Sequence, residues 1–204
     1  MTDKPFAPAT ERNGQPILEV IRHEFRASRS VLEIGSGTGQ HAVVFGAALS
    51  HVTWQTSDRD DNHSGIHAWL EEAGISNVLP PLSLDVLTAE LPRSSYDAVF
   101  SANTSHIMSY AAVEKMFELV SGVLKDDGVF CLYGPFLKDG KFNTPSNAEF
   151  DQSLRNRDPE MGIRDLEDLD RLGADGFLCR SRLYAMPANN NLAVWTKQIN
   201  RRRS

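Results

Sequence analysis

One stretch decides the fold: Val31-Leu32-Glu33-Ile34-Gly35-Ser36-Gly37-Thr38-Gly39-Gln40-His41. Its apolar start predicts a short buried strand, and the apolar segment 40–49 that follows the glycines predicts a helix. Glycines at alternate positions directly after a strand let the backbone turn tightly and approach a ligand without a Cβ in the way. A helix that begins there offers unpaired N–H groups and the positive end of its dipole. We therefore expect a ligand site at this loop.

The same alternation of strand and helix continues along the chain. Apolar runs predict further strands within 52–56, 78–86, 96–102, 129–133, 177–184 and 192–195. Helical spacing of apolar residues appears around Ile66 and from Val113 onward, where Asp127-Gly128 is the expected helix stop. We therefore expect an α/β fold, a doubly wound (Rossmann-like), mostly parallel seven-stranded sheet with an antiparallel terminal strand and helices on both faces.

We expect residues 1–204 to form a single domain, because a chain of this length buries a full core without disulfides or metal ions. Residues 1–28 are expected to form an irregular segment and then a helix that begins near Gln15, with Pro16 in its first turn. Residues 134–162 are polar and contain proline and glycine, and a stretch of this length is typical of a functional loop. We interpret it as an insertion over the active site.

Charge and hydropathy exclude several classes of partner. The net charge is −6, from 27 acidic and 21 basic residues, so we expect no nucleic-acid partner. The one basic cluster, Arg201-Arg202-Arg203, is interpreted as a solvated tail. No apolar run approaches the roughly 18 residues that span a bilayer, so we expect no membrane segment. The first residues lack a cationic stretch followed by an apolar one, which favours a cytoplasmic location over secretion.

The glycine loop itself narrows the choice of ligand. A dinucleotide-binding loop would need glycine where this chain has Gln40, and a P-loop would need Gly-Lys-Ser/Thr, which is absent. Glu33 lies two residues before the first glycine, where a carboxylate can neutralise a cationic ligand group. The pattern Glu-x-Gly-x-Gly-x-Gly resembles the first motif of class I S-adenosylmethionine-dependent methyltransferases. The alternative is a strand–turn–helix junction whose glycines serve packing alone.

This resemblance implies a set of cofactor-binding residues. The loop residues Gly35, Ser36, Gly37 and Gly39 would cradle S-adenosylmethionine. Asp58 ends the second predicted strand, where a carboxylate can accept hydrogen bonds from both ribose hydroxyls, although it could equally cap a turn.

Three further positions complete the implied cofactor site. In the resembling family an acid after the third strand meets the adenine amino group and the next backbone amide meets the ring, which implies roles for Asp85 and Val86. A surface aspartate at a strand end is the alternative. Asn103 ends the fourth strand, on the rim where the sulfonium would lie. Arg12 could reach the donor's carboxylate through a charge-assisted pair, or be a surface charge.

A closer resemblance covers nearly the whole chain. It is carried by segments in one order from Arg12 to Lys197, among them Ser36-Gly37-Thr38-Gly39-Gln40-His41, Ser57-Asp58, Tyr133-Gly134-Pro135-Phe136 and Met186-Pro187-Ala188-Asn189-Asn190. These segments look like the methyltransferase-like 26 family of uncharacterised methyltransferases. The chain departs after the fourth strand, where the family usually has Asn-Met-Ile-His-Ile-Ser-Pro-Trp and this chain has Asn103-Thr104-Ser105-His106-Ile107-Met108-Ser109-Tyr110. The resemblance therefore implies a methyl-donor site but no particular acceptor.

Candidate catalytic residues follow from the demands of methyl transfer, which needs alignment and exclusion of water, and a base only for a protonated acceptor. His106 follows the fourth strand and is the candidate base or orienting group, or else a packed loop residue. Tyr110 and Tyr133 could offer a π-face to the sulfonium or a hydroxyl to the acceptor, or belong to the core. His63 and His67 have a spacing that could hold zinc, but no further ligands are evident, so we expect no metal site.

The sequence therefore predicts an enzyme, a methyltransferase whose unidentified acceptor is a small molecule or a protein side chain. The alternative is a non-catalytic module of the same fold that docks a protein partner, which the altered stretch after the fourth strand motivates. A nicotinamide-dependent oxidoreductase is a third possibility, against which Glu33 and Gln40 argue. The oligomeric state does not follow from the sequence.

Overall fold

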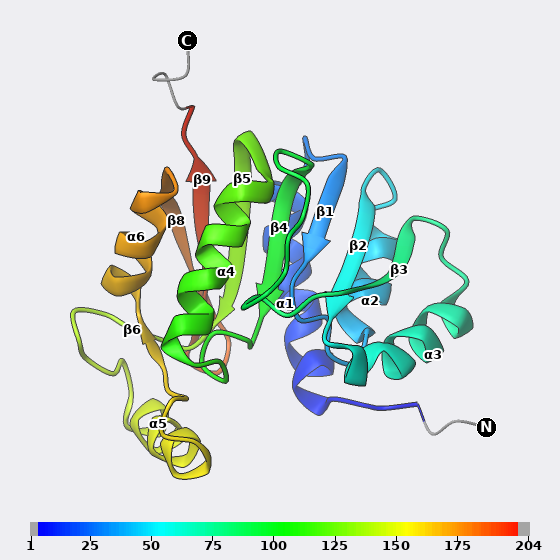
Figure 1. The fold of residues 1–204 in the computed structure, drawn as a ribbon. Helices are drawn as coiled ribbons and strands as arrows, with labels where there is room; N and C mark the ends of the chain where they lie inside the picture. Colours follow the sequence, from blue (N-terminus) through cyan, green and yellow to red (C-terminus); the bar gives the residue numbers. More distant parts are fainter. Residues whose placement is uncertain (1–3, 200–204) are drawn as a thin grey trace.

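The computed structural model describes residues 4–199, so the first residues and the basic tail at 201–203 lie outside the described part of the chain. Seven strands form one sheet in the order β3-β2-β1-β4-β5-β9-β8 (Figure 1). Their bounds are β1 Ser30–Glu33, β2 Thr53–Asp58, β3 Val78–Ser83, β4 Tyr96–Ala102, β5 Leu124–Gly134, β8 Leu178–Met186 and β9 Asn190–Lys197. All neighbours pair in parallel except β9, which runs antiparallel to both β5 and β8. The expected fold class is confirmed.

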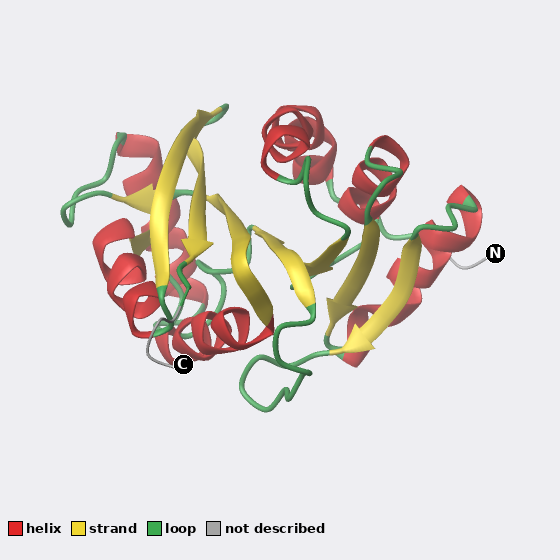
Figure 2. Cartoon of the chain, turned by 90° about the horizontal axis from the view of Figure 1, so that it is seen from above, coloured by secondary structure: helices red, strands yellow, loops and turns green. Residues whose placement is uncertain are grey.

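Helices cover both faces of the sheet (Figure 2). Helices α1 (Pro8–Glu24) and α2 (Gln40–Ala48) pack on one face, and α4 (Tyr110–Val123) and α6 (Leu166–Asp175) pack on the other. Helix α3 (His63–Ala73) packs against β3 and α2. Because successive strand residues point to opposite faces, Val31 enters the core beneath α1 and α2 while Leu32 enters the core beneath α4. Two apolar cores therefore hold the sheet from both sides.

The N-terminal helix begins earlier than the sequence indicates. Helix α1 starts at Pro8, not near Gln15, and Pro16 lies inside it. Pro8 suits the first helical position, because the N–H that proline lacks has no partner there. Pro16 removes one bond from the middle of the helix, but burial of Ile17 and Ile21 holds the segment on the sheet.

The long helix before β5 also differs from expectation. Helix α4 ends at Val123, and Asp127-Gly128 form an irregular bulge inside β5 rather than a helix stop. Pairing of β5 with β4 shifts between Leu124 and Val129, and Asp127 adopts a positive φ of 62°. A Cβ on Gly128 would lie 2.8 Å from the Lys125 carbonyl oxygen, so the tight bulge requires glycine.

Residues 134–162 contain regular structure. Strand β6 (Phe136–Leu137) pairs with β7 (Arg164–Asp165), and helix α5 (Pro145–Arg157) lies between them in the chain. The Thr144 hydroxyl accepts a hydrogen bond from the Asn147 N–H and caps α5. Figure 1 shows α5 at the same end of the molecule as the N-terminal segment. Among the described residues, none of the helices is both long and apolar enough to cross a bilayer.

Candidate functional site

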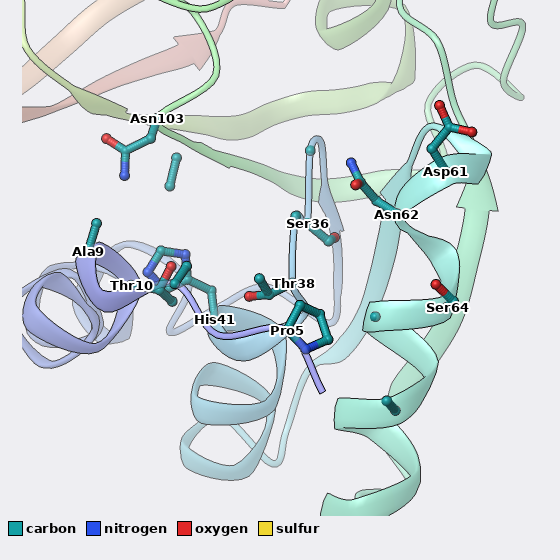
Figure 3. A pocket seen from close by; sticks show the side chains of 16 residues that line it. Pro5, Ala9, Thr10, Ser36, Thr38, His41, Asp61, Asn62, Ser64 and Asn103 are labelled. Atoms are coloured by element: carbon teal, nitrogen blue, oxygen red, sulfur yellow. The ribbon is translucent and has the colours of Figure 1, made fainter. Parts of the chain in front are cut away.

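The sheet reverses its winding between β1 and β4. From β1 the chain proceeds to β2 and β3 on one side, and then crosses to β4 and β5 on the other. In open α/β sheets ligands bind at such a switch point, beyond the carboxyl ends of the strands. A cavity of about 710 Å³ opens there (Figure 3), within the range of small-molecule sites. It is lined by Pro5, Ala7, Ala9, Thr10, Gly35, Ser36, Gly37, Thr38, His41, Asp61, Asn62, Ser64, Gly65, Ala68, Ala102 and Asn103.

A second cavity adjoins the first at Gly35, which lines both. Its volume is about 250 Å³, and its walls are mostly apolar with two carboxylates. The lining residues are Ile34, Gly35, Asp58, Arg59, Leu84, Asp85, Val86, Leu87, Ile107, Met108, Ser109 and Ala112. We call these the loop cavity and the apolar cavity. Together they form a site along the ends of β1, β2, β3 and β4.

The loop between β1 and α2 needs its glycines for two physical reasons. Gly35, Gly37 and Gly39 all have positive φ, at 74°, 57° and 91°, a region that side chains disfavour. A Cβ on Gly35 would lie 2.6 Å from Cγ2 of Thr104, and one on Gly39 would lie 3.0 Å from Cα of Ile66. The loop is also tied to β2, because the N–H groups of Gly35 and Ser36 both donate to the Ser57 carbonyl.

Asp58 connects the glycine loop to the end of β2. Its Oδ2 accepts a 2.7 Å hydrogen bond from the Gly37 N–H, and its Oδ1 accepts from the Arg59 N–H and the Asn62 side chain. A carboxylate has about four acceptor positions. Oδ2 therefore keeps one of them for a ligand hydroxyl at the wall of the apolar cavity.

Glu33 lies beneath the loop and lines neither cavity. It is 2% exposed, and its Oε2 accepts hydrogen bonds from the Ser36 hydroxyl at 2.8 Å and the Trp54 indole at 3.1 Å. Burial raises the pKa of Glu33 from 4.5 to about 7, against the opposing effect of these two donors. The structure therefore gives Glu33 a role in shaping the loop.

Backbone N–H groups are the donors that the loop cavity offers to an anionic ligand group. The Thr38 N–H has no acceptor among the described residues. In the first turn of α2 the Gln40 N–H donates to the Thr38 hydroxyl at 3.4 Å, which leaves the N–H groups of His41 and Ala42 unpaired by helix geometry. The described lining contains no lysine or arginine, and Asp61 is its charged side chain. Arg12 is exposed and lies outside the lining, because Asn13 and Gly14 occupy the buried face of α1.

The remaining expected cofactor residues lie at the two cavities. Asp85 and Val86 line the apolar cavity just after β3. Asn103 lines the loop cavity and has a positive φ of 60°, with its N–H donating to the Tyr133 carbonyl at 2.9 Å. Asparagine adopts this left-handed conformation more readily than most residues, which suits the sharp turn at the end of β4. The structure thus brings Gly35, Ser36, Gly37, Asp58, Asp85, Val86 and Asn103 together, whereas Gly39 supports the loop from outside the lining.

The three expected catalytic side chains line neither cavity. His106 is 5% exposed, packs against Phe150 of α5 with ring centroids 5.4 Å apart, and has an Nδ1 atom without a hydrogen-bond partner. Burial and the nearby Arg164 charge lower the pKa of His106 to about 4. Tyr110 is 40% exposed at the start of α4, and Tyr133 is buried in the core. Their assignment to catalysis stays a prediction.

The insertion flanks the site without lining the loop cavity. Arg164, directly after it, is buried and donates to the carbonyl oxygens of Ser105, Met108 and Glu160. These bonds hold the β4–α4 loop, three residues of which line the apolar cavity. No residue of 134–162 lines either cavity, and the expectation that this insertion covers the active site stays a prediction.

The sequence analysis did not predict two parts of the site. Residues 4–10 form what we call the N-terminal strap, which crosses the loop cavity and contributes Pro5, Ala7, Ala9 and Thr10 to it (Figure 3). Gln40 holds the strap, because its Oε1 accepts a 2.6 Å hydrogen bond from the Ala7 N–H and another from Thr38. The signal in the sequence was Gln40 itself, which stands where a dinucleotide-binding loop would have glycine.

His41 is the second missed feature. It lines the loop cavity from the first turn of α2, and its Nε2 lies 2.8 Å from Oδ1 of Asn13. Its ring stacks on Phe45, with centroids 5.0 Å apart and planes 11° apart. Burial lowers the pKa of His41 to about 4, so the ring is neutral near pH 7.

Comparison with protein families gives one match over almost the whole chain. The family is described as "Protein of unknown function (DUF938)", and its model matches residues 4–197. The chain therefore belongs to this family.

Solved structures with the same fold are methyltransferases or proteins of similar architecture. An O-methyltransferase family protein from Burkholderia thailandensis is 14% identical, with a TM-score of 0.79 over 92% of this chain and 57% of that one. Human N-acetylserotonin methyltransferase in complex with SAM is 13% identical, with a TM-score of 0.79 over 94% and 53%. The YcgJ protein from Bacillus subtilis is 16% identical, with a TM-score of 0.71 over 91% and 100%. This chain thus spans little more than half of the first two, and at these identities the likeness shows a shared fold.

Proposed function

We propose that this member of the DUF938 family is a methyltransferase that uses S-adenosylmethionine to methylate a small molecule. One observation carries the proposal: the loop cavity, with its free backbone N–H groups, and the apolar cavity meet at Gly35, with Asp58 between the loop and the apolar wall. A nucleoside with an amino-acid tail matches this arrangement, with its base in the apolar cavity, its ribose beside Asp58 and its charged tail in the loop cavity. The same fold in human N-acetylserotonin methyltransferase, solved with SAM, and in PigF, solved with SAH, supports the proposal.

The residues present fit that cofactor. The apolar walls from Leu84, Val86 and Met108 suit a purine, with Asp85 at the rim to accept from its amino group. The free acceptor position on Asp58 suits a ribose hydroxyl. The open N–H groups at the start of α2 suit the carboxylate of the tail. When bound, S-adenosylmethionine would supply a methyl group already activated by a positively charged sulfur.

The chain's own part in the reaction is binding, alignment and exclusion of water. The N-terminal strap covers the loop cavity, and the rigid glycine loop fixes the ligand because Glu33, Ser57 and Asp58 all hold it. Among the described residues, the lining of the loop cavity has no lysine or arginine. The loop cavity therefore favours a neutral or cationic acceptor over an anionic one. The segments shared with the methyltransferase-like 26 family also support methyl transfer, and membership of that narrower family is part of this proposal.

Calorimetry with S-adenosylmethionine and S-adenosylhomocysteine tests the proposal directly. We expect both to bind and NAD not to bind. Asp58→Asn should weaken binding about ten- to a hundredfold, because a hydrogen bond to a charged group is worth roughly 1.5–3 kcal/mol. Asp60→Asn is the matched control, since Asp60 is exposed and lines neither cavity.

If neither S-adenosylmethionine nor S-adenosylhomocysteine gave a heat of binding, the proposal would be refuted. Binding without methylation of any compound in a metabolite extract, together with stoichiometric copurification of one protein, would favour the non-catalytic docking module instead.

A further inference from the structure

The loop cavity contains one side chain that is both buried and able to accept a proton. His41 is nine-tenths buried and lines the cavity. In Figure 3 its ring lies beside Ala9 and Thr10, on the side from which Asn103 also enters, whereas Asp61, Asn62 and Ser64 line the opposite side. Asp58 and Asn62 are hydrogen-bonded to each other at that opposite side. His41 therefore belongs to the end of the cavity away from the ribose position.

One hydrogen bond fixes the protonation of the ring. Nε2 of His41 lies 2.8 Å from the amide oxygen of Asn13, which can only accept, so Nε2 carries the proton. Asn13 on α1 thus holds one tautomer of His41 on α2.

The other ring nitrogen is left as an open acceptor. Nδ1 of His41 has no hydrogen-bond partner among the described residues, and it is not one of the fully buried unpaired atoms, so it is reached from the cavity. The ring cannot rotate freely, because it stacks on Phe45 and packs edge to face with Phe100, with ring centroids 6.1 Å apart. A neutral, immobile lone pair therefore faces the loop cavity, on the side away from Asp58 and Asn62.

We propose that Nδ1 of His41 accepts a hydrogen bond from the atom of the acceptor molecule that takes the methyl group. The acceptor is then an uncharged molecule with a hydroxyl or an amine N–H at that atom, and His41 turns the lone pair of that atom toward the methyl carbon. As the new bond to the methyl carbon forms, the carbon–sulfur bond of the donor would break and sulfur would keep its electron pair. The proton of the methylated atom would pass to Nδ1 of His41 and from there to water. Carboxylates and thiolates, which carry no such hydrogen, are excluded as acceptors. This inference rests on the proposed function, because it needs a bound methyl donor.

The competing role for His41 is contact with the amino group of the donor's own tail. The two roles differ in what a change of His41 removes. Loss of a contact with the acceptor leaves donor affinity unchanged, whereas loss of a contact with the tail weakens it. His41→Phe makes this distinction, since it keeps a ring to stack on Phe45 and removes both nitrogens. His23→Phe is the matched control, because His23 is exposed on α1 and outside both cavities.

The experiment starts with the full chain and S-adenosylhomocysteine in a calorimeter. No binding to the unaltered protein would overturn the proposed function itself. Given binding, side-chain nitrogen NMR of the loaded, histidine-labelled protein follows Nδ1 of His41 during titration with phenol, aniline and anisole. We expect phenol or aniline to shift this resonance and anisole, which lacks the donor hydrogen, to leave it in place. If neither phenol nor aniline shifts the Nδ1 resonance, the inference about His41 is overturned while the proposed function stands. This measurement uses the unaltered protein, so it does not depend on whether a variant folds.

The variants give the second measurement. We expect both His41→Phe and His23→Phe to bind S-adenosylhomocysteine within twofold of the unaltered protein. Phenol affinity of the loaded protein should fall about three- to tenfold in His41→Phe, as for loss of one neutral hydrogen bond, and stay unchanged in His23→Phe. A fall in S-adenosylhomocysteine affinity confined to His41→Phe would assign His41 to the donor's tail and overturn the inference.

Discussion

Gly35 shows most directly why single residues in the loop are fixed. Its positive φ of 74° disfavours any side chain, and the methyl group of Thr104 occupies the space in which a Cβ would lie. Gly37 shares the positive φ, but nothing lies within 4 Å of its missing Cβ. The two glycines look equivalent in the sequence. In the structure, a side chain at Gly37 would meet backbone strain alone, whereas one at Gly35 would meet backbone strain and a collision.

We therefore predict different costs for the two alanine substitutions. Gly37→Ala should lower the free energy of unfolding by about 1 kcal/mol, from the left-handed backbone alone. Gly35→Ala should lower it by about 2–4 kcal/mol, because a collision adds to the strain. Thr104→Ser removes the colliding methyl and keeps the hydroxyl bonded to Ser101, so it should restore part of the loss. Urea denaturation measures all three, and equal costs for the two alanines would contradict this account.

Glu33 makes stability depend on pH in an unusual direction. Burial raises the pKa of Glu33 from 4.5 to about 7, so the unfolded chain loses its proton at lower pH than the folded chain does. The resulting stability is fully present below pH 4.5 and is lost as the pH rises to about 7. The loss is about 3 kcal/mol for a shift of this size.

Glu33→Gln should remove this loss. The amide oxygen still accepts from Ser36 and Trp54, but it carries no charge to bury. Relative to the unaltered protein, we expect the variant to gain about 3 kcal/mol between pH 4.5 and pH 7.5, measured by urea denaturation at both. Glu19→Gln, at an exposed position of α1, is the control and should show no such gain. A constant difference across this range would contradict the raised pKa.

Residues at strand ends were predictable because periodicity locates the ends of buried strands. Asp58 ends β2, while Asp85, Val86 and Asn103 follow β3 and β4, and the parallel sheet brings all four to one edge. Arg12 was not predictable, because the face that a helical residue occupies depends on where the helix begins and on what covers it.

At the scale of elements, the N-terminal strap is held by α3 as well as by Gln40 of α2. Lys4 pairs with Glu72 at 2.6 Å and lies over the Trp69 ring, and the Trp69 indole donates to the Pro5 carbonyl. Pro5 fits against Gly65, where a Cβ would lie 2.6 Å from the proline ring. The strap therefore depends on α3 for its position over the loop cavity.

Trp69→Phe should loosen the strap, because it removes the hydrogen bond to Pro5 while keeping an aromatic ring. We expect cleavage by chymotrypsin after Phe6, an exposed residue of the strap, and dissociation of S-adenosylhomocysteine each to become about two- to tenfold faster, as for loss of one hydrogen bond. Limited proteolysis and stopped-flow displacement measure the two rates. Tyr96→Phe removes a hydroxyl at the other edge of the sheet and should change neither. Faster cleavage with unchanged dissociation would show that the strap does not retain the ligand.

Elements were predictable where their apolar period was complete. The strands and α2 follow directly from such runs, whereas the strap has no period and its contacts come from residues more than 30 positions away, such as Gln40. The end of α4 was missed for a different reason. Asp-Gly is equally suited to a helix stop and to a bulge, and the pairing of β5 with β4, which the sequence does not display, selects the bulge.

At the scale of the whole molecule, the parallel sheet gathers distant segments at one edge. The loop after β1, the residues after β2 and β3, and the β4–α4 loop all meet there, together with the strap from the other end of α1. The opposite edge carries short turns, including Leu49–Val52 and the bulge near Asp127. A single ligand that spans both cavities would therefore contact segments from most of the first half of the chain.

Hydrogen exchange tests whether one ligand spans both cavities. With S-adenosylhomocysteine bound, we expect slower exchange of backbone amides in the segments 4–10, 35–41, 58–65, 84–87 and 103–109. The turns at the opposite edge should exchange at an unchanged rate, because they lie outside both cavities. A ligand confined to the loop cavity would protect the strap and the glycine loop but leave 84–87 unchanged, which would contradict the assignment of the apolar cavity to the base. Asp85→Asn then serves as an independent check, since only a base held in the apolar cavity makes binding depend on that carboxylate.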